Sequence, residues 1–163
     1  MASYRRCADV MVKLIGHGGD LNVGCEDFDP FYEDVMWTPL QVAISEGSFP
    51  VTMSLLQHGA NPNALDNLGK TALHLASYRR GIREVELLLK YGANMDVRDK
   101  KGWAPLHEAA YLGPVQVVVV LLNRGADPHV QTYDGKTRIQ LASTPASCIS
   151  EESQAQTIRL FVI

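Results

Sequence analysis

Apolar residues recur at helical spacing in three places along the chain, and each run stops at a glycine. The runs are Val51, Leu55 and Leu56, then Val85, Leu88 and Leu89, then Val118, Leu121 and Leu122, followed by Gly59, Gly92 and Gly125. A spacing of three to four residues puts side chains on one face of a helix. Glycine readily takes the left-handed conformation that ends a helix. The pattern therefore predicts three short helices, each with one apolar face.

A second pattern precedes each of these helices. Residues 70–76 read Lys-Thr-Ala-Leu-His-Leu-Ala, and related stretches begin 33 residues apart, at Trp37, Trp103 and Lys136. A turn with glycine stands before the later copies, and threonine or proline favours a helix start. We therefore expect a short first helix in each unit, about residues 71–78 in the third. Small residues recur at the same period and let neighbouring helices approach closely: Ala43, Ala76, Ala109 and Ala142.

One helix pair of this size cannot bury its own apolar face, so the units must stack on one another as a solenoid. The period predicts one domain over residues 1–163, with an incomplete unit at each end. Because the last unit ends on apolar residues rather than a polar cap, we expect a fragment of a longer array. The expected parts are a half repeat at 2–23, an acidic insert at 24–36, repeats at 32–64, 65–97 and 98–130, and a divergent repeat at 131–163.

The composition changes this picture little. The 163 residues are 46% hydrophobic and 20% charged, with a net charge of −3, which gives no electrostatic reason to expect nucleic acid or a membrane as partner. The three cysteines, Cys7, Cys25 and Cys148, have no CxxC spacing. They favour a reducing compartment, and we expect an intracellular protein of the cytoplasm or nucleus.

The repeated pattern resembles the ankyrin repeat. It combines Asp-x-x-Gly-x-Thr-Ala-Leu-His-x-Ala with a later Leu-Leu-x-x-Gly-Ala-Asn, at a period of 33 residues. The resemblance implies an all-α solenoid of stacked helix pairs, with β-hairpin turns projecting at right angles and a concave binding surface. The chain departs from the family pattern at four positions, which affects local hydrogen bonding rather than the fold. Gln41 and Gln140 replace the motif histidine, Ala104 its threonine, and Arg80 a glycine.

Nothing in the sequence indicates a catalytic or metal site. His74 and His107 lie one period apart, which places them roughly 10 Å from each other, too far to share a metal ion without other ligands. The resemblance implies instead that they hydrogen-bond within and between turns. No nucleophile stands in a known motif beside a base, and no phosphate-binding glycine pattern occurs. We therefore expect no enzyme activity, cofactor, metal or small-molecule substrate.

The variable positions indicate a binding surface for another protein. In ankyrin repeats the hairpin tips and the ends of the first helices face the concave side. Aromatic and cationic side chains are enriched at the centres of protein interfaces. The alternative is that the tryptophans pack between adjacent hairpins and that Tyr133 covers the next one. The candidate partner-binding residues are Trp37, Lys70, Tyr78, Arg79, Lys100, Lys101, Trp103, Tyr111, Leu112, Tyr133 and Lys136.

The acidic insert exceeds the repeat pattern. Residues 25–34 hold five carboxylates, three aromatic residues and no cation. Phe31 interrupts the ligand series that a calcium loop requires. The insert is either a finger that contacts the partner or a loop that folds onto the basic positions, and the sequence leaves both open.

Two further expectations concern function. The leading prediction is a non-catalytic module that binds a partner peptide or domain through its concave face and hairpin tips. The alternative is a structural or regulatory segment of a larger adaptor or enzyme, for example a ubiquitin-ligase substrate-recognition subunit. The family resemblance also implies that Asn63 is a possible substrate for asparaginyl hydroxylation.

Overall fold

The computed structural model of the chain describes residues 13, 16–22, 24–26, 35–112 and 115–137. Most of the predicted half repeat, residues 27–34 of the acidic insert and residues 138–163 of the last repeat lie outside this part. The boundaries proposed for those units stay predictions.

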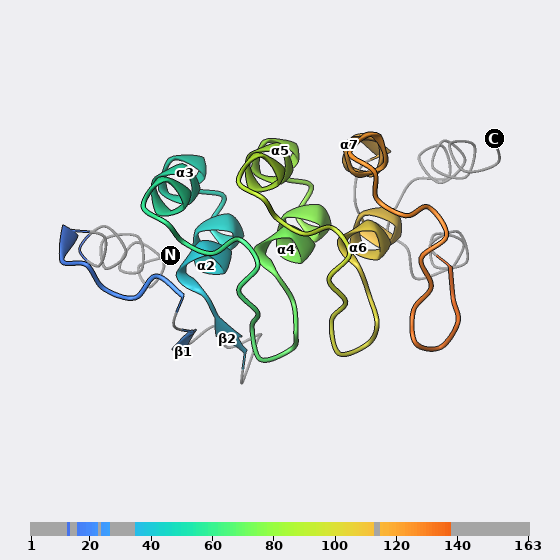
Figure 1. Cartoon of the computed structure of the whole chain (residues 1–163), viewed down its shortest axis with the longest axis horizontal. Coiled ribbons are helices and arrows are strands. Elements are labelled where there is room, and N and C mark those ends of the chain that lie inside the picture. Colours follow the sequence, from blue (N-terminus) through green and yellow to red (C-terminus); the bar gives the residue numbers. More distant parts are fainter. Residues whose placement is uncertain (1–12, 14–15, 23, 27–34, 113–114, 138–163) are drawn as a thin grey trace.

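The helices form two parallel rows (Figure 1). The first row consists of α2 (Pro39–Ser45), α4 (Ala72–Tyr78) and α6 (Pro105–Leu112), and the second of α3 (Phe49–Gln57), α5 (Ile82–Lys90) and α7 (Val115–Asn123). Helix α4 packs against both α2 and α6, and α5 packs against α3 and α7. The chain is therefore the solenoid of helix pairs that its period predicts.

Helices α2 and α4 each start where a threonine and a polar side chain three residues later cap each other. Thr38 donates its backbone N–H to Oε1 of Gln41, 2.8 Å away, and its hydroxyl accepts the backbone N–H of Gln41. Thr71 and His74 form the same reciprocal cap at α4. Such a cap satisfies donors that the start of a helix leaves free. The polar residue at this position thus fixes the helix start.

The core lies between the two rows and repeats with the sequence. Six leucines at equivalent positions are almost fully buried: Leu40, Leu73 and Leu106 in the first row, and Leu55, Leu88 and Leu121 in the second. Ala43, Ala76 and Ala109 are buried as well, where the first-row helices meet. Burial of a leucine side chain contributes about 1.5–3 kcal/mol. Stacking of neighbouring repeats therefore supplies most of the stabilisation.

The connections between repeats project from the first helix row as long hairpin-shaped turns (Figure 1). Gly69, Gly102 and Gly135 take φ values of 78°, 79° and 73° at the tips, as predicted for tight turns. Strand pairing within the described residues is confined to β1 (Cys25–Glu26), antiparallel to β2 (Met36–Trp37), and an isolated bridge between Gln131 and Thr137. The fold class is all-α. None of the described helices is long and apolar enough to cross a membrane.

Candidate interaction surface

Buried side chains at the start of each first helix tie one repeat to the next. Nε2 of His74 lies 2.9 Å from the carbonyl oxygen of Trp103, and Nε2 of His107 lies 3.1 Å from that of Val130. Gln41 stands at the same position and donates from Nε2 to the carbonyl oxygen of Lys70, 2.9 Å away. The prediction that these histidines hydrogen-bond within and between turns is confirmed. Glutamine performs the same role, so its substitution for histidine leaves the stacking intact.

His74 is an uncharged structural group. Its Nδ1 accepts the backbone N–H of Thr71, so the ring proton resides on Nε2 and is donated to the Trp103 carbonyl. Burial lowers the pKa of His74 from 6.5 to about 4, outweighing the carbonyl of Trp103, which favours the charged form. His74 is therefore neutral at neutral pH and has no free nitrogen for a metal ion or a substrate.

A groove opens beside α4, between the hairpin-shaped turns of two repeats, and we call it the α4 groove. Its volume is about 200 Å³. Apolar and cationic side chains from three segments line it, chiefly Trp37, Leu68, Lys70, Leu75, Tyr78 and Arg79. Four of these six were predicted to contact a partner. The structure therefore brings Trp37, Lys70, Tyr78 and Arg79 to one place.

These residues differ in how far they reach solvent. Tyr78 ends α4 and is 40% exposed, and Arg79 beside it is exposed too. Trp37, in contrast, is only 6% exposed and belongs to the buried core. It forms a wall of the groove rather than an exposed anchor, because packing within the stack takes up most of its surface. Only the edge of Trp37 that faces the groove is thus available to contact a partner.

The tips of neighbouring turns are joined edge to edge. Lys100 donates its backbone N–H to the carbonyl oxygen of Leu68, 3.0 Å away. Lys100 and Lys101 are both exposed at this tip. Two predicted cations therefore stand directly next to a residue that lines the α4 groove.

A second group of candidates lies on α6 and just before it. The ring centroids of Trp103 and Tyr111 are 5.4 Å apart in an edge-to-face arrangement, with 79° between the planes. Both residues are half-buried. Edge-to-face aromatic pairs stabilise by about 0.5–1.5 kcal/mol beyond the area they bury. These two side chains therefore support each other as well as presenting one partly open aromatic surface. Leu112 is the last residue of α6, and its side chain lies outside the described part.

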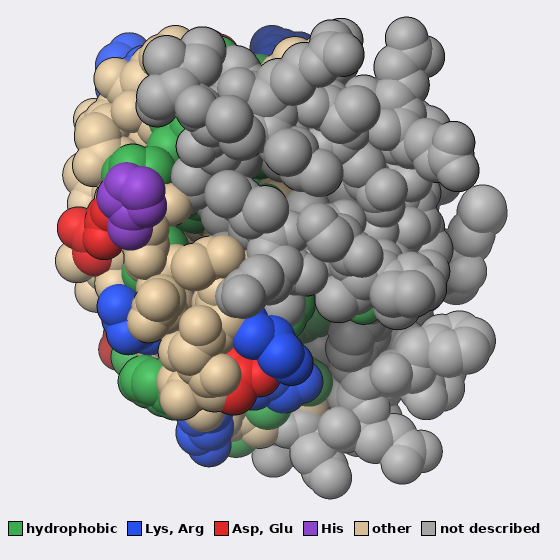
Figure 2. Space-filling view, turned by 90° about the vertical axis from the view of Figure 1, so that its right-hand side faces the viewer, with side chains coloured by type: hydrophobic (Ala, Val, Ile, Leu, Met, Phe, Trp, Pro, Cys, Tyr) green, Lys and Arg blue, Asp and Glu red, His purple; other side chains and the backbone are tan. Residues whose placement is uncertain are grey.

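The candidates in the last described turn are more exposed. Tyr133 is 69% exposed, although its backbone and ring lie directly over Gly102 of the preceding turn. Lys136 forms an ion pair with Asp134 at 2.9 Å, with both side chains more than half exposed. In Figure 2, which faces the C-terminal end, Lys or Arg side chains lie beside Asp or Glu side chains near the lower edge. Exposed pairs of this kind contribute little to stability.

Sequence reasoning missed the ion pair that lies behind the α4 groove. The ammonium of Lys70 is 2.5 Å from Oε1 of Glu108 and 4.0 Å from Asp99. Burial alone would lower the pKa of Lys70, but the charges of Glu108 and Asp99 outweigh it and raise the pKa. Burial raises the pKa of Glu108. The positions one period before Lys70 and Glu108 hold Trp37 and Leu75, so the pair does not recur and the repeat pattern carried no signal for it.

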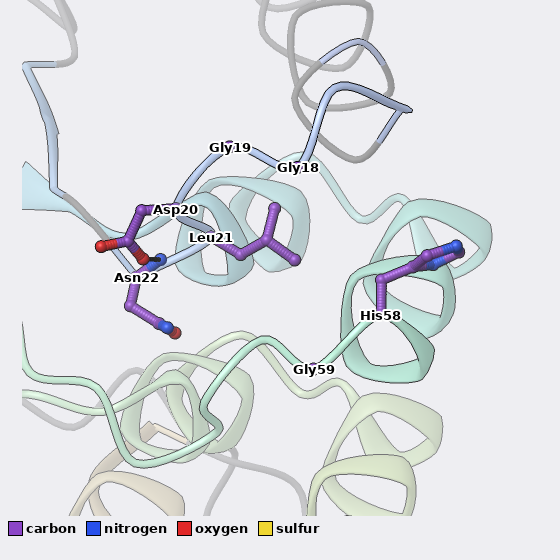
Figure 3. Close-up of a pocket in the computed structure, with 7 residues that line it drawn as sticks. All are labelled: Gly18, Gly19, Asp20, Leu21, Asn22, His58 and Gly59. Atoms are coloured by element: carbon purple, nitrogen blue, oxygen red, sulfur yellow. Dashed lines mark hydrogen bonds between the residues drawn. The ribbon is translucent and has the colours of Figure 1, made fainter.

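A second, polar hollow marks a repeat junction on the side of the second helix row (Figure 3). It lies between the segment Gly18 to Asn22 and the loop of His58 and Gly59. Oδ1 of Asn22 accepts the backbone N–H of Asn61 at 2.8 Å. Asn63 repeats this bond one unit later, accepting the backbone N–H of Asn94 at 2.7 Å. The hollow is thus bordered by the first of these bonds, which holds two adjacent repeats together.

Both polar atoms of the Asn63 side-chain amide form hydrogen bonds to the next repeat. Its Oδ1 accepts from Asn94, and its Nδ2 donates to the carbonyl oxygen of Gly92, 3.0 Å away. Hydroxylation of Asn63 stays a prediction, and a hydroxylase would first have to withdraw this side chain from the junction. Among the described residues no group of three or more His, Cys, Asp or Glu side chains gathers to hold a metal ion.

Comparison with known proteins identifies the family. The family model for ankyrin repeats (3 copies) matches residues 1–99 and 66–132, so the chain belongs to the ankyrin-repeat family. Ankyrin repeats are generally protein–protein interaction modules and generally non-catalytic. The chain is 40% identical over 80 residues to the ankyrin repeat protein nuc-2 of Neurospora crassa, a match that covers 49% of this chain and 7% of that protein.

The chain is also similar to a relative that is named as an enzyme. The chain is 46% identical over 43 residues to the palmitoyltransferase ZDHHC13 of Homo sapiens, a match that covers 26% of this chain and 7% of the relative. The matched stretches are thus a small part of both relatives.

Proposed function

We propose that this chain is a non-catalytic module that binds another protein, as a peptide or a domain, through the α4 groove and the hairpin tips beside it. The observation that carries the proposal is the groove itself, in which Leu68, Leu75 and Tyr78 stand beside the cation of Arg79. Apolar and aromatic side chains beside arginine are the usual composition of interface centres.

Preorganisation is the proposed mechanism of binding. Trp37 is packed in the core, Lys70 is held by Glu108, and Lys100 is fixed to Leu68 through its backbone. Side chains and turns that are ordered before binding lose less entropy when a partner arrives. A stack of this kind therefore needs fewer contacts for a given affinity than a flexible loop.

The polar groups buried in the stack support the non-catalytic part of the proposal. His74, His107 and Gln41 each use their side chains to join repeats. A catalytic site requires polar groups that converge on a space where a substrate fits.

We also propose that the protein works in the cytoplasm or nucleus, which imaging of a fluorescent fusion would test.

The experiment is affinity capture from a cell extract with the wild-type chain and with Trp103 and Tyr111 both replaced by alanine. We expect the double variant to lose the captured partner. Because the two rings are half-buried and support each other, we also expect a loss of about 2–4 kcal/mol in the free energy of unfolding. Capture that is unchanged by the double replacement would exclude these two residues from the interface. A far larger loss of helical circular dichroism would show that they are packing residues instead.

A second proposal is that the repeats act as a structural or regulatory segment of a larger adaptor or enzyme, such as a subunit that selects substrates for a ubiquitin ligase. It is supported by the small share of each relative, 7%, that the match covers. Sequencing the complete transcript tests it. A catalytic or ligase-recruiting domain in the same reading frame would favour this second proposal over an independent module.

A further inference from the structure

We propose that the α4 groove binds a short acidic peptide that inserts one large apolar side chain between Trp37, Leu68 and Tyr78. This inference rests on the proposed function and specifies the chemistry of the partner. It follows from the size of the groove and from an imbalance of accessible charge around it.

The size of the groove suits a single anchoring side chain. Its volume is about 200 Å³. An apolar cavity of about 150 Å³ is known to take up a benzene molecule. The α4 groove therefore has room for one aromatic ring or one leucine side chain, against walls formed by Trp37, Leu68, Leu75 and Tyr78.

Among the residues that the structure describes, the carboxylates nearest the groove are buried and engaged. Asp66 lines the groove as well, but it is only 8% exposed, and its Oδ1 accepts the backbone N–H groups of Leu68 and Lys70. Asp99 and Glu108 are each 3% exposed, and both lie within 4.0 Å of the Lys70 ammonium. A partner that approaches this surface does not meet their charge in the open.

The cations, in contrast, face solvent. Arg79 lines the groove and is exposed, and within the part of the chain that the structure describes it forms no ion pair. Lys100 and Lys101 are exposed at the next tip, which is hydrogen-bonded to Leu68 of the groove. Positive side chains around an apolar pocket favour a partner with carboxylates on either side of its anchor. A basic peptide would meet like charges and be rejected.

Selection from a random library of displayed peptides on the immobilised chain tests the proposal. We expect the enriched peptides to share one aromatic residue or leucine flanked by Asp or Glu. Binding of one such peptide, labelled with fluorescein, would then be measured by anisotropy with the variants Arg79→Glu and Leu68→Asp. We expect each variant to weaken binding at least about tenfold, and added salt to weaken it as well.

Arg124→Glu is the matched control. Arg124 directly follows α7 as Arg79 directly follows α4, and both are exposed. The control changes the charge of the chain equally but outside the groove, so it should bind the peptide like wild type. Replacing the apolar anchor of the peptide by serine should cost as much affinity as Leu68→Asp.

Several results would overturn the proposal. They are enrichment of basic or uncharged peptides, absence of any enrichment, and equal effects of Arg79→Glu and Arg124→Glu. Displacement of the peptide by a single-stranded oligonucleotide of equal charge would point to nucleic acid instead. A dimer of the chain that Arg79→Glu dissociates would make a second copy the occupant. Capture of a partner that binds at Arg79 through basic residues would contradict this inference. It would still support the proposed function.

Discussion

The ammonium of Lys70 lies 2.5 Å from the carboxylate of Glu108 and so joins the turn before α4 to helix α6 of the following repeat. The Glu108 side chain is 4% exposed and that of Lys70 is 32% exposed. Removing one member of a buried pair leaves an uncompensated charge, which costs more than the pair itself contributes. The pair is therefore a sensitive point of contact between the two repeats.

Lys70→Met should lower the free energy of unfolding by about 2 kcal/mol, less than for a fully buried pair because Lys70 is partly solvated. Adding Glu108→Gln to this variant should restore part of the loss, since the unpaired charge is then removed. Urea denaturation followed by circular dichroism measures both values. If the double variant is less stable than Lys70→Met, the buried charge is not the source of the loss.

Acidification should weaken the stack through His74. The unfolded chain takes up this proton near pH 6.5, whereas the folded state keeps His74 neutral down to about pH 4. Protons therefore bind preferentially to the unfolded chain within this window, and stability falls as the pH drops from about 6.5 to about 4. The contribution of His74 is about 3 kcal/mol by the end of the window.

His74→Gln isolates this contribution. Gln41 forms the equivalent bonds in the preceding repeat, so the variant should keep the wild-type stability at pH 7 to within about 1 kcal/mol. Between neutral and acidic pH it should lose less stability than wild type in denaturant titrations. Identical pH profiles for the two proteins would place the acid sensitivity in other groups.

Two glycines with the same backbone conformation should respond differently to alanine. Gly102 and Gly135 have φ values of 79° and 73°. A Cβ atom on Gly102 would lie 2.5 Å from the backbone nitrogen of Tyr133, whereas one on Gly135 meets no atom of the described residues within 4 Å. Gly135→Ala should cost about 0.5–1 kcal/mol, because the strain of the left-handed backbone exceeds the chain entropy that alanine saves.

Gly102→Ala should cost more than Gly135→Ala, because the turn of Tyr133 must also move away. The difference between the two melting temperatures measures how tightly adjacent tips are stacked. Equal melting temperatures would mean that the Tyr133 turn shifts without cost.

Arg80→Gly should stabilise the chain. Arg80 has a φ of 66° at a position where Gly47 has 67° in the preceding repeat. A residue with a side chain pays about 1–2 kcal/mol in the left-handed region, part of which the greater chain entropy of glycine offsets. We expect a net gain of about 0.5–1 kcal/mol in thermal or urea unfolding. Arg79→Gly, next to it with a φ of −83°, should instead lose stability.

The period predicted the two helix rows, the buried leucines and the positive φ values of the turn glycines, because each depends on contacts that recur in every repeat. It did not predict how exposed the residue two positions before each first-row helix would be. Trp37, Lys70 and Trp103 occupy the same repeat position, yet Trp37 is in the core whereas Trp103 is half-buried. Their exposure depends on side chains from neighbouring repeats that vary from unit to unit.

Sequence reasoning located some of the candidate residues but not the contacts that they make, because those contacts also vary from unit to unit. The sequence identified Tyr78 and Arg79 by their type and position, and they do lie together with Lys70 in one groove. The pairing of Lys70 with Glu108 and the support of Trp103 by Tyr111 depend on side-chain directions across a junction. A periodic pattern contains no information on such contacts.

The hydrogen bonds between repeats run in both directions, and this makes the stack tolerant of changes in length. Gln41 donates forward to Lys70, while Asn94 donates backward to Asn63. If the unit 65–97 were excised, the carbonyl of Trp103 would meet Gln41, as it now meets His74. Loss or duplication of one complete unit thus preserves the junction chemistry, and so does an insertion within a turn, because Asn22 still accepts from Asn61 across the acidic insert. Such a protein can therefore vary in length by whole units, or by residues added within a turn, without any change in how its repeats join.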